Sequence, residues 1–369
     1  MKILMTADTL GGVWTYATEL CAALRPHGVQ IALATLGRPL SRSQREDVSQ
    51  LPNVHVYESR FRLEWMPSPW DSLAEAAGWL LSLERQVRPD VIHLNHLVHG
   101  DLPWNAPVLV AGHSCVFSWW KAVRGGKPGP EWTEYRNRVE ASLQAANHVV
   151  APSRAMLSAL WHHYGPFRHS RVIPNARSAH KFWQGRKQPM ILSAGRLWDD
   201  AKNVGTLCKT AHSLTWPVFV VGPCDGPDGQ KQNLSGVTQV GELPSALLSR
   251  WLALASIYAA PARYEPFGLT ALEAALSGCA LVLGDIESQR EVWGNSALYV
   301  DPGSTDHLRD VLNAVAHRPG VLPTLAKRAR LRAERYNPQQ FAASYRALYR
   351  SLNNTMEGSR CASYSSITH

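Results

Sequence analysis

The stretch SIYAAPARYEPFGLTALEAALSGCALVLGD, residues 256–285, decides the fold class because it contains a complete strand–helix–strand unit. The apolar run 256–262 is typical of a buried strand, and residues 269–277 have helical spacing that ends at Gly278. The apolar run 279–285 predicts a second strand. Continuous apolar strands joined through a helix favour a parallel sheet that is covered on both faces.

The same alternation of strands and helices continues along the chain. The strand-like runs of the first half are KILMTA, VQIALATL, VHVYE, VIHLNH, PVLVAGH, HVVAPS and RVIPNA, and those of the second half also include MILSAGR, PVFVVG, GVTQVGE and ALYVDP. Residues 176–189 are polar and basic without periodicity, which indicates a linker. We therefore expect an α/β protein with two doubly wound, Rossmann-like domains, 1–176 and 177–335, whose strands end at a common cleft.

Composition restricts the class of protein. Of the 369 residues, 45% are hydrophobic and 18% charged, which is ordinary for a soluble globular chain, and no apolar run is long enough for a transmembrane helix. The start, MKILMTADTL, indicates a strand rather than a secretory signal, so we expect a cytoplasmic protein. Six cysteines without a CxxC pair indicate neither a zinc site nor a thiol redox site.

The net charge of +9 favours anionic partners, such as nucleotides, phosphates, acidic lipids or nucleic acid. The basic residues form no long run, so general surface charge is an alternative explanation. Nucleic-acid binding is supported by the charge alone, and we do not expect it. Weak contact with the inner face of an acidic membrane is compatible with the charge.

A glycine pair, Gly11 and Gly12, lies between the first strand and a helical pattern that ends at Gly28. Such a pair lets backbone amides approach a ligand closely, although a tight turn without a ligand would have the same sequence. The motif GGVWTY is not the dinucleotide fingerprint GxGxxG, and the second strand ends in ATLG without an acid. Nicotinamide binding is therefore disfavoured.

Two cations, Arg196 and Lys202, follow the strand ILSAG six positions apart. At the carboxyl end of a strand they can converge on one diphosphate, with the planar fork of arginine beside the compact charge of lysine. Two solvated surface cations are the alternative. Asn203 begins the next helical stretch, and we expect its side chain to cap that helix.

Two acids, Glu265 and Glu273, flank the turn in the opening stretch. Pro266 favours an extended Glu265, and Gly268 frees the backbone before a helix whose first amides form an anion site. Eight residues along one helix correspond to a rotation of about 80°, so both acids face one ligand only if Glu265 lies in the loop. Each carboxylate then accepts hydrogen bonds from sugar hydroxyls at one end of a phosphate-bearing ligand. The alternative is ion pairing or an exposed helix surface.

Together these residues resemble the E-x7-E motif of the retaining glycosyltransferases of family four, which have the two-domain GT-B fold. The resemblance extends over most of the chain, through GGV at 11–13, VIHLNH, VAPSRA, VIPNA and AGRLWDDAKN. Pro174, Asn175 and Ala176 depart from it, since the family usually has Pro-Asn-Gly there. The resemblance implies that helical segment 336–352 crosses back to the first domain. The Ser-rich tail 353–369 is expected to be disordered.

The resemblance also implies roles for the candidate residues. Arg196 and Lys202 would hold the donor diphosphate, Glu273 would bind ribose hydroxyls, and Glu265 would bind donor-sugar hydroxyls. The remaining donor contacts would come from Gly11, Gly12, Phe267, Gly268 and Leu269, with His113 beside the sugar; a hydrogen-bonded structural histidine is the alternative. The chain has no Asp-x-Asp pair, so we expect no metal requirement and no bound cofactor.

The first domain is expected to bind the acceptor. Trp119, Trp120 and Lys121 are the candidates, because indole rings beside cations can stack on a sugar or pack on a lipid-like tail. Loop packing is the alternative for these tryptophans. The leading hypothesis is therefore a retaining transferase that moves a hexose-type sugar from a nucleoside-diphosphate sugar to a glycan, lipid-linked or small-molecule acceptor, in cell-surface polysaccharide or glycolipid synthesis. A nucleotide-sugar epimerase or hydrolase is the alternative, and a non-catalytic binder is a third hypothesis.

Overall fold

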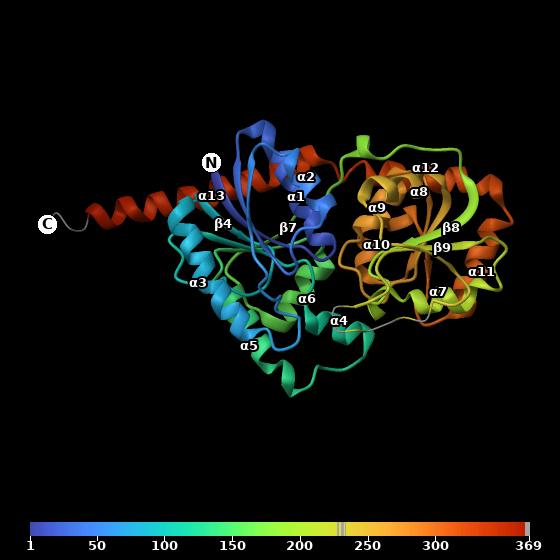
Figure 1. Ribbon diagram of the computed structural model, residues 1–369, viewed down its shortest axis with the longest axis horizontal. Coiled ribbons are helices and arrows are strands. Elements are labelled where there is room, and N and C mark those ends of the chain that lie inside the picture. Colours follow the sequence, from blue (N-terminus) through green and yellow to red (C-terminus); the bar gives the residue numbers. More distant parts are fainter. Residues whose placement is uncertain (227–228, 230–231, 233, 366–369) are drawn as a thin grey trace. The chain divides into compact units, whose positions relative to one another are not determined.

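The computed structural model describes residues 1–226, 229, 232 and 234–365, and it divides into two compact units (Figure 1). The N-terminal unit comprises Met1–Ser118, Lys127–Pro174 and the chain from Pro338 onward. The C-terminal unit comprises Trp119–Gly126 and Asn175–Asn337. Each unit is built around one parallel sheet, which confirms the predicted α/β class.

The sheet of the N-terminal unit has the strand order β3-β2-β1-β4-β5-β6-β7. The strands are β1 (Lys2–Asp8), β2 (Gln30–Leu36), β3 (Val54–Glu58), β4 (Val91–Leu94), β5 (Val108–Ala111), β6 (His148–Ala151) and β7 (Ser170–Val172). The helices between them are α1 (Gly12–Leu24), α2 (Arg42–Ser49), α3 (Trp70–Val87), α4 (Val116–Val123), α5 (Thr133–Ala145) and α6 (Arg154–Tyr164). Every strand-like run predicted in this half coincides with one of these strands.

The sheet of the C-terminal unit has the order β10-β9-β8-β11-β12-β13. The strands are β8 (Gln188–Ala194), β9 (Val218–Val221), β10 (Thr238–Gly241), β11 (Ala255–Ala260), β12 (Ala280–Gly284) and β13 (Leu298–Val300). The helices are α7 (Val204–Ala211), α8 (Ser245–Leu254), α9 (Leu269–Leu276), α10 (Glu287–Trp293), α11 (Thr305–Ala316) and α12 (Leu322–Ala333). The predicted runs of this half are confirmed as well.

The strand order of the C-terminal unit reverses between β8 and β11. These strands pair in parallel, with Ile191 beside Ile257 and Leu192 beside Tyr258. The loops that follow Ala194 and Ala260 therefore leave the same edge of the sheet. In open α/β sheets, ligands bind outside the carboxyl ends of the strands at this kind of reversal.

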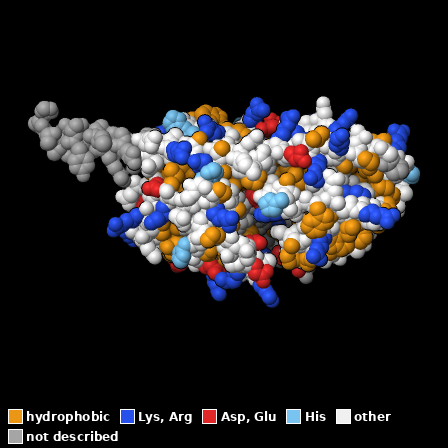
Figure 2. All heavy atoms as spheres, turned by 90° about the horizontal axis from the view of Figure 1, so that it is seen from above, with side chains coloured by type: hydrophobic (Ala, Val, Ile, Leu, Met, Phe, Trp, Pro, Cys, Tyr) orange, Lys and Arg blue, Asp and Glu red, His pale blue; other side chains and the backbone are white. Residues whose placement is uncertain are grey.

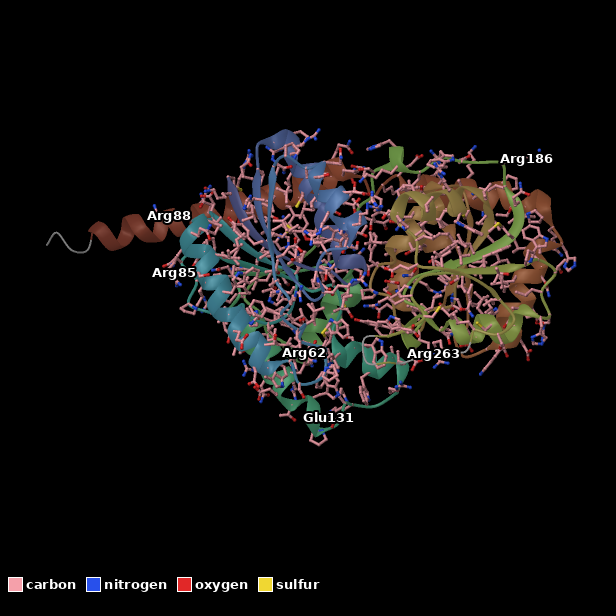
Figure 3. The ribbon with its side chains drawn as sticks, viewed as in Figure 1. Arg62, Arg85, Arg88, Glu131, Arg186 and Arg263 are labelled. Atoms are coloured by element: carbon pink, nitrogen blue, oxygen red, sulfur yellow. The ribbon has the colours of Figure 1, made fainter. Side chains whose placement is uncertain are left out.

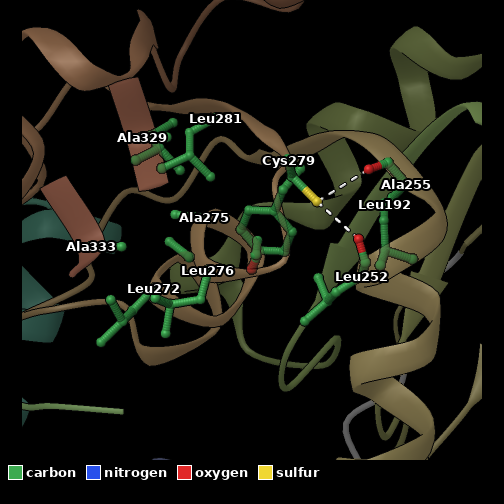
Figure 4. Close-up of a cluster of buried hydrophobic side chains, with 14 of the residues drawn as sticks. Leu192, Leu252, Ala255, Leu272, Ala275, Leu276, Cys279, Leu281, Ala329 and Ala333 are labelled. Atoms are coloured by element: carbon green, nitrogen blue, oxygen red, sulfur yellow. Dashed lines mark hydrogen bonds between the residues drawn. The ribbon is translucent and has the colours of Figure 1, made fainter. Parts of the chain in front are cut away.

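A cluster of buried apolar side chains packs around α9 (Figure 4). Leu272 and Leu276 of α9 pack with Leu192 and Leu281 of the sheet, and all four are at most 2% exposed. The thiol of Cys279 donates to the carbonyls of Leu252 and Ala255, each at 3.2 Å. Burial raises the pKa of this thiol, so Cys279 is a packing residue, and α9 has a rigid base.

The last helix, α13 (Pro338–Ser365), belongs to the N-terminal unit and contacts α1. The Tyr16 hydroxyl donates to the Tyr345 hydroxyl at 2.5 Å, and His93 Nδ1 lies 2.7 Å from the Tyr349 hydroxyl. These buried polar contacts fix the register of α13. Of the tail 353–369 that was expected to be disordered, residues up to Ser365 are within α13, and 366–369 lie outside the described residues.

The basic residues of the chain are dispersed. On the face shown in Figure 2, lysine and arginine side chains are interspersed with other residues over the whole surface. The arginines labelled in Figure 3 are exposed: Arg85 and Arg88 lie together at the end of α3, whereas Arg62, Arg186 and Arg263 lie in three separate loops. In the described part of the chain, no helix combines the length and the apolarity that a bilayer crossing needs.

Candidate functional site

The turn after β8 brings two backbones into close approach. Gly195 has φ 151°, and a Cβ atom at Gly222 would lie 1.8 Å from the Gly195 carbonyl oxygen. Only glycine therefore fits at position 222. The Gly195 amide bonds to the Val221 carbonyl at 2.9 Å, and the chain then turns so that Arg196–Lys202 lies along the carboxyl edge of the sheet.

Lys202 and Glu265 meet at this edge. Lys202 Nζ lies 2.5 Å from Glu265 Oε2, and the two side chains are 24% and 23% exposed. Their loops are joined by the Arg263 amide, which donates to the Ala201 carbonyl at 2.8 Å. The structure thus brings together two residues that the sequence predicted for one ligand, and they form an ion pair with each other.

Arg196 also has a carboxylate partner, Asp199, which the sequence reasoning missed. Arg196 donates to Asp199 Oδ2 at 2.9 Å, and the buried Asp199 also accepts from Trp119 Nε1 at 2.9 Å and from the Ala201 amide at 3.0 Å. The spacing of three residues between Arg196 and Asp199 was the available signal. Asp199 orients Arg196 and also caps the short 3-10 turn that ends at Lys202.

The side-chain cap predicted at Asn203 is wrong. Asn203 occupies the first position before α7, but among the described residues no backbone amide of that helix donates to its side chain. Its amide nitrogen donates instead to the carbonyls of Pro261 and Pro302, both at 2.8 Å. The Asn203 side chain therefore ties the loop that carries Lys202 to the residues that follow β11 and β13.

The predicted start of α9 is confirmed. Gly268 precedes the helix with φ 90°, Glu265 lies outside the helix, and Glu273 lies within it. The Gln289 side chain from α10 donates to the Phe267 carbonyl at 3.2 Å, and the Ser288 hydroxyl donates to the Glu265 carbonyl at 2.6 Å. Two hydrogen bonds from α10 therefore anchor the loop that carries Glu265.

A cavity opens between these loops and the sheet edge. Among the described residues, its lining includes Lys202, Glu265 and Gly268 but neither Arg196 nor Glu273. The full lining is Ser193, Ala194, Gly195, Leu197, Lys202, Val204, Tyr258, Ala260, Ala262, Glu265, Gly268, Thr270, Ala271 and Gln289. Phe267 is buried beneath the turn, and Leu269 is the first residue of α9.

The cavity floor carries a neutral phenol. The Tyr258 hydroxyl donates to the Ala194 carbonyl at 3.1 Å. Burial raises the pKa of Tyr258, and the charges of Glu265 and Glu273 raise it further. Tyr258 therefore remains a hydrogen-bond donor at every physiological pH.

Glu273 forms a buried ion pair with Arg177. Arg177 Nε lies 2.8 Å from Glu273 Oε1, and the side chains are 6% and 10% exposed. The sequence reasoning missed Arg177, because a single arginine in a polar linker carries no signal for a partner far along the chain. Glu273, the candidate residue for binding ribose hydroxyls, is therefore already oriented by a cation.

His113 in the N-terminal unit follows β5. Its Nε2 lies 2.9 Å from Asn95 Oδ1, and the Asn95 amide nitrogen donates to the Thr6 carbonyl at 2.7 Å. This orients the Asn95 amide, so His113 Nε2 carries the hydrogen and Nδ1 is an acceptor. Burial lowers the pKa of His113 to about 4, so the ring is neutral. In the same unit, Gly11 has φ 98° and Gly12 begins α1, and both are exposed.

The aromatic pair of α4 groups with the C-terminal unit. The Trp119 and Trp120 rings lie 6.3 Å apart in an edge-on arrangement, and Lys121 is exposed. Trp119 donates to Asp199, and Arg124 pairs with Asp200 at 2.7 Å while lying 5.6 Å from the Trp119 ring centroid. Trp119 thus contacts the loop that carries Arg196.

The site has the chemistry of an anion and hydroxyl receptor. Two cations and the amino end of an eight-residue helix attract a dianion, and two carboxylates accept hydrogen bonds from hydroxyl groups. Within the part of the chain that is described, no group of three or more His, Cys, Asp or Glu side chains is arranged to hold a metal ion.

Two family models match the sequence. The model described as Glycosyltransferase Family 4 matches residues 10–179, and the model described as Glycosyl transferases group 1 matches residues 188–318. Among curated relatives, the D-inositol 3-phosphate glycosyltransferase of Arthrobacter sp. (strain FB24) is 24% identical over 379 residues. That alignment covers 90% of this chain and 88% of the relative.

Solved structures with the same fold include sucrose-phosphate synthase from Thermosynechococcus elongatus. Its TM-score is 0.79 at 19% identity, over 96% of this chain and 100% of that chain. Anabaena HepE, solved in complex with UDP and glucose, has a TM-score of 0.75 at 16% identity, over 95% of this chain and 100% of that chain. These similarities establish the GT-B fold, with two Rossmann-like domains.

Proposed function

Because the chain belongs to glycosyltransferase family 4, we propose that it moves a hexose from a nucleoside-diphosphate sugar to an acceptor hydroxyl and retains the configuration at the anomeric carbon. The observation that carries this proposal is the arrangement of Lys202, Glu265 and the amino end of α9 around one cavity. That cavity lies at the strand reversal where α/β sheets bind ligands.

Arg196 and Lys202 stabilise the departing nucleoside diphosphate. As the bond between the anomeric carbon and the phosphate oxygen breaks, the diphosphate gains negative charge, and Arg196 and Lys202 stabilise it. The amides of Phe267, Gly268 and Leu269 support the same charge from the start of α9. For Lys202 to do this, its ammonium group must exchange the Glu265 carboxylate for phosphate oxygens.

The two acids recognise hydroxyl groups. Glu265, released from Lys202 by the incoming diphosphate, accepts hydrogen bonds from the donor sugar, and Glu273 accepts them from the ribose. His113 offers an acceptor at Nδ1 to the sugar, and the exposed turn at Gly11 and Gly12 gives backbone access to the diphosphate. These roles are extended from the family to the residues that occupy the matching positions.

Two relatives suggest where to look for substrates. HepE was solved with UDP and glucose, so UDP-glucose is the first donor to test. The Arthrobacter relative is named for D-inositol 3-phosphate, so a phosphorylated polyol is the first acceptor to test. Trp120 and Lys121 would stack on and pair with such an acceptor. Glycan and lipid-linked acceptors are the second class to test, because the proposed role is in cell-surface polysaccharide or glycolipid synthesis.

The proposal is tested in two steps. Thermal unfolding is first measured with UDP-, GDP- and ADP-sugars, because a ligand that binds only the folded chain raises the midpoint temperature. The donor that stabilises the chain is then incubated with radiolabelled sugar and a panel of polyol, glycan and lipid-linked acceptors. A labelled product with the anomeric configuration of the donor supports the proposal. Binding with release of only free sugar or an epimer would overturn it.

A further inference from the structure

We propose that Arg177 is a positioning residue that sets the orientation and the charge of Glu273 for the hydroxyls of the donor ribose. This inference rests on the proposed function, since it assigns Arg177 as the partner of Glu273, the residue that would bind the ribose hydroxyls. Neither residue lines the cavity directly, so the inference depends on how the pair is held and where it points.

Arg177 is itself fixed from several sides. Its backbone amide donates to the Tyr336 carbonyl at 3.1 Å, and its guanidinium carbon lies 5.2 Å from the centroid of the Phe182 ring. Its side chain is 6% exposed, so it has little freedom to adopt another rotamer. A guanidinium held in this way keeps its positive charge in one place beside the Glu273 carboxylate.

Glu273 lies at the border of the cavity. Thr270 and Ala271 line the cavity, and Glu273 is three residues beyond Thr270, so both project from one face of α9. This spacing places the Glu273 side chain on the face of α9 that borders the cavity with Lys202 and Glu265.

The ion pair fixes one side of the Glu273 carboxylate. Arg177 Nε lies 2.8 Å from Glu273 Oε1. A cation beside a buried carboxylate favours its ionised form, and a carboxylate with about four lone-pair sites can accept hydrogen bonds from a diol beside such a contact. Arg177 is therefore placed to set the orientation in which Glu273 meets the ribose.

The ribose preference is the property to measure. The probes are three pairs of nucleotides, UDP with 2′-deoxy-UDP, GDP with 2′-deoxy-GDP and ADP with 2′-deoxy-ADP, titrated calorimetrically. For the pair that binds, we expect the wild-type chain to favour the ribonucleotide by roughly tenfold or more, because a hydrogen bond to a charged acceptor is lost in the deoxy form. In Glu273→Gln and in Arg177→Met most of this preference should disappear, and the double variant should lose no more than either single variant.

The conservative variant gives a second signature. Arg177→Lys keeps a positive charge beside Glu273 and loses the planar fork, so it should restore part of the ribose preference that Arg177→Met loses. Arg332→Met is the control, because the partly buried Arg332 side chain donates to the carbonyls of Val292 and Glu291 on α10 rather than to a residue of α9.

The outcomes separate the two proposals. If Arg177→Met weakens both members of a nucleotide pair equally and keeps the ribose preference, Arg177 has only a structural role and the inference is overturned. If Arg177→Met does not fold, Arg177→Lys decides in the same way, by a reduced or an unchanged preference. If none of the six nucleotides binds the wild-type chain, the proposed function fails and the inference fails with it.

Discussion

At the scale of single residues, the ion pair between Lys202 and Glu265 is the contact that a ligand must rearrange. Each side chain is about a quarter exposed, and ion pairs of this kind contribute roughly 0–1 kcal/mol to stability. A diphosphate, with two charges and the helix amides of α9 behind it, competes easily for such a lysine. The pair therefore positions Lys202 without holding it against substrate.

Glu265→Gln separates the effect of Glu265 on Lys202 and the diphosphate from its effect on the donor sugar. The glutamine side chain carries no negative charge beside the diphosphate site and does not compete for Lys202. Calorimetry should therefore show that this variant binds bare nucleoside diphosphate at least as tightly as wild type, and up to about tenfold more tightly. Turnover of the nucleotide sugar should fall by at least tenfold, because the hydroxyls of the sugar lose a charged acceptor.

Glu287→Gln, an exposed acid at the start of α10, is the control for that substitution. It should change neither the nucleotide affinity nor turnover. Weaker binding of bare nucleoside diphosphate by Glu265→Gln would show that Glu265 supports the lysine rather than competes for it.

Arg196→Ala and Lys202→Ala should each lower kcat by about 100-fold or more, because each removes a charge that stabilises the leaving diphosphate. Steady-state rates measure this, and thermal unfolding should show a small change because neither side chain is buried. Arg250→Ala and Lys209→Ala, exposed positions on α8 and α7, are the charge-matched controls. Rates near wild type for both Arg196→Ala and Lys202→Ala would remove these residues from the mechanism.

Residue-level prediction from sequence worked where the backbone supplies the signal. Lys202 and Glu265 were identifiable because each follows a recognisable strand, and such ends share one edge of a parallel sheet. Asp199 was missed although its spacing of three residues from Arg196 was a local signal, whereas Arg177 was missed because no local pattern encodes its contact with Glu273.

At the scale of elements, α9 is delimited by two glycines with positive φ. Gly268 has φ 90° before the helix, and Gly278 has φ 79° after it. The helix boundaries were predictable from sequence for this reason, because glycine marks both ends. The cap at Asn203 was mispredicted because the Pro261 and Pro302 carbonyls, distant in sequence, engage its side chain.

Replacing these glycines separates stability from ligand binding. Gly268→Ala and Gly278→Ala should each lower the free energy of unfolding by about 1–2 kcal/mol, because an L-residue is strained at positive φ. Only Gly268→Ala should also weaken nucleotide binding, since its Cβ would lie 3.2 Å from the Gln289 amide and 3.4 Å from Glu265 at the cavity. Denaturant titration and calorimetry measure the two effects, and equal losses of affinity in both variants would contradict an anion site at Gly268.

At the scale of the whole molecule, the fold class was predictable and the strand order was not. Apolar runs and glycine turns identify strands locally, whereas the orders β3-β2-β1-β4-β5-β6-β7 and β10-β9-β8-β11-β12-β13 depend on which edges pair in three dimensions. The grouping of Trp119–Gly126 with the C-terminal unit is likewise a tertiary fact. It reflects the contacts of Trp119 with Asp199 and of Arg124 with Asp200, in the loop that carries Lys202.

A group of buried histidines in the N-terminal unit makes its stability depend on pH. A chain of hydrogen bonds links two of them. The Thr6 hydroxyl lies 3.0 Å from His96 Nδ1, and His96 Nε2 lies 2.8 Å from His99 Nδ1. His99 Nε2 in turn lies 2.9 Å from the Leu73 carbonyl. Burial lowers the pKa of His96 and His99, and it lowers the pKa of His93 to about 3 and of His113 to about 4. All four rings are neutral in the folded unit.

Acidification should therefore destabilise the N-terminal unit before the C-terminal unit. Unfolded histidine has a pKa of about 6.5, so below that pH the unfolded chain binds more protons than the folded chain, and the free energy of unfolding falls until the folded pKa values are reached near 3 to 4. His113 alone contributes on the order of 3 kcal/mol over this interval. Hydrogen-exchange protection factors, compared at pH 7 and pH 5, should fall in β1 and β4 and stay nearly constant in β11 and β12. The reason is that, among the described residues, the histidines whose pKa values burial lowers lie in the N-terminal unit. Equal losses of protection in both sheets would contradict this assignment.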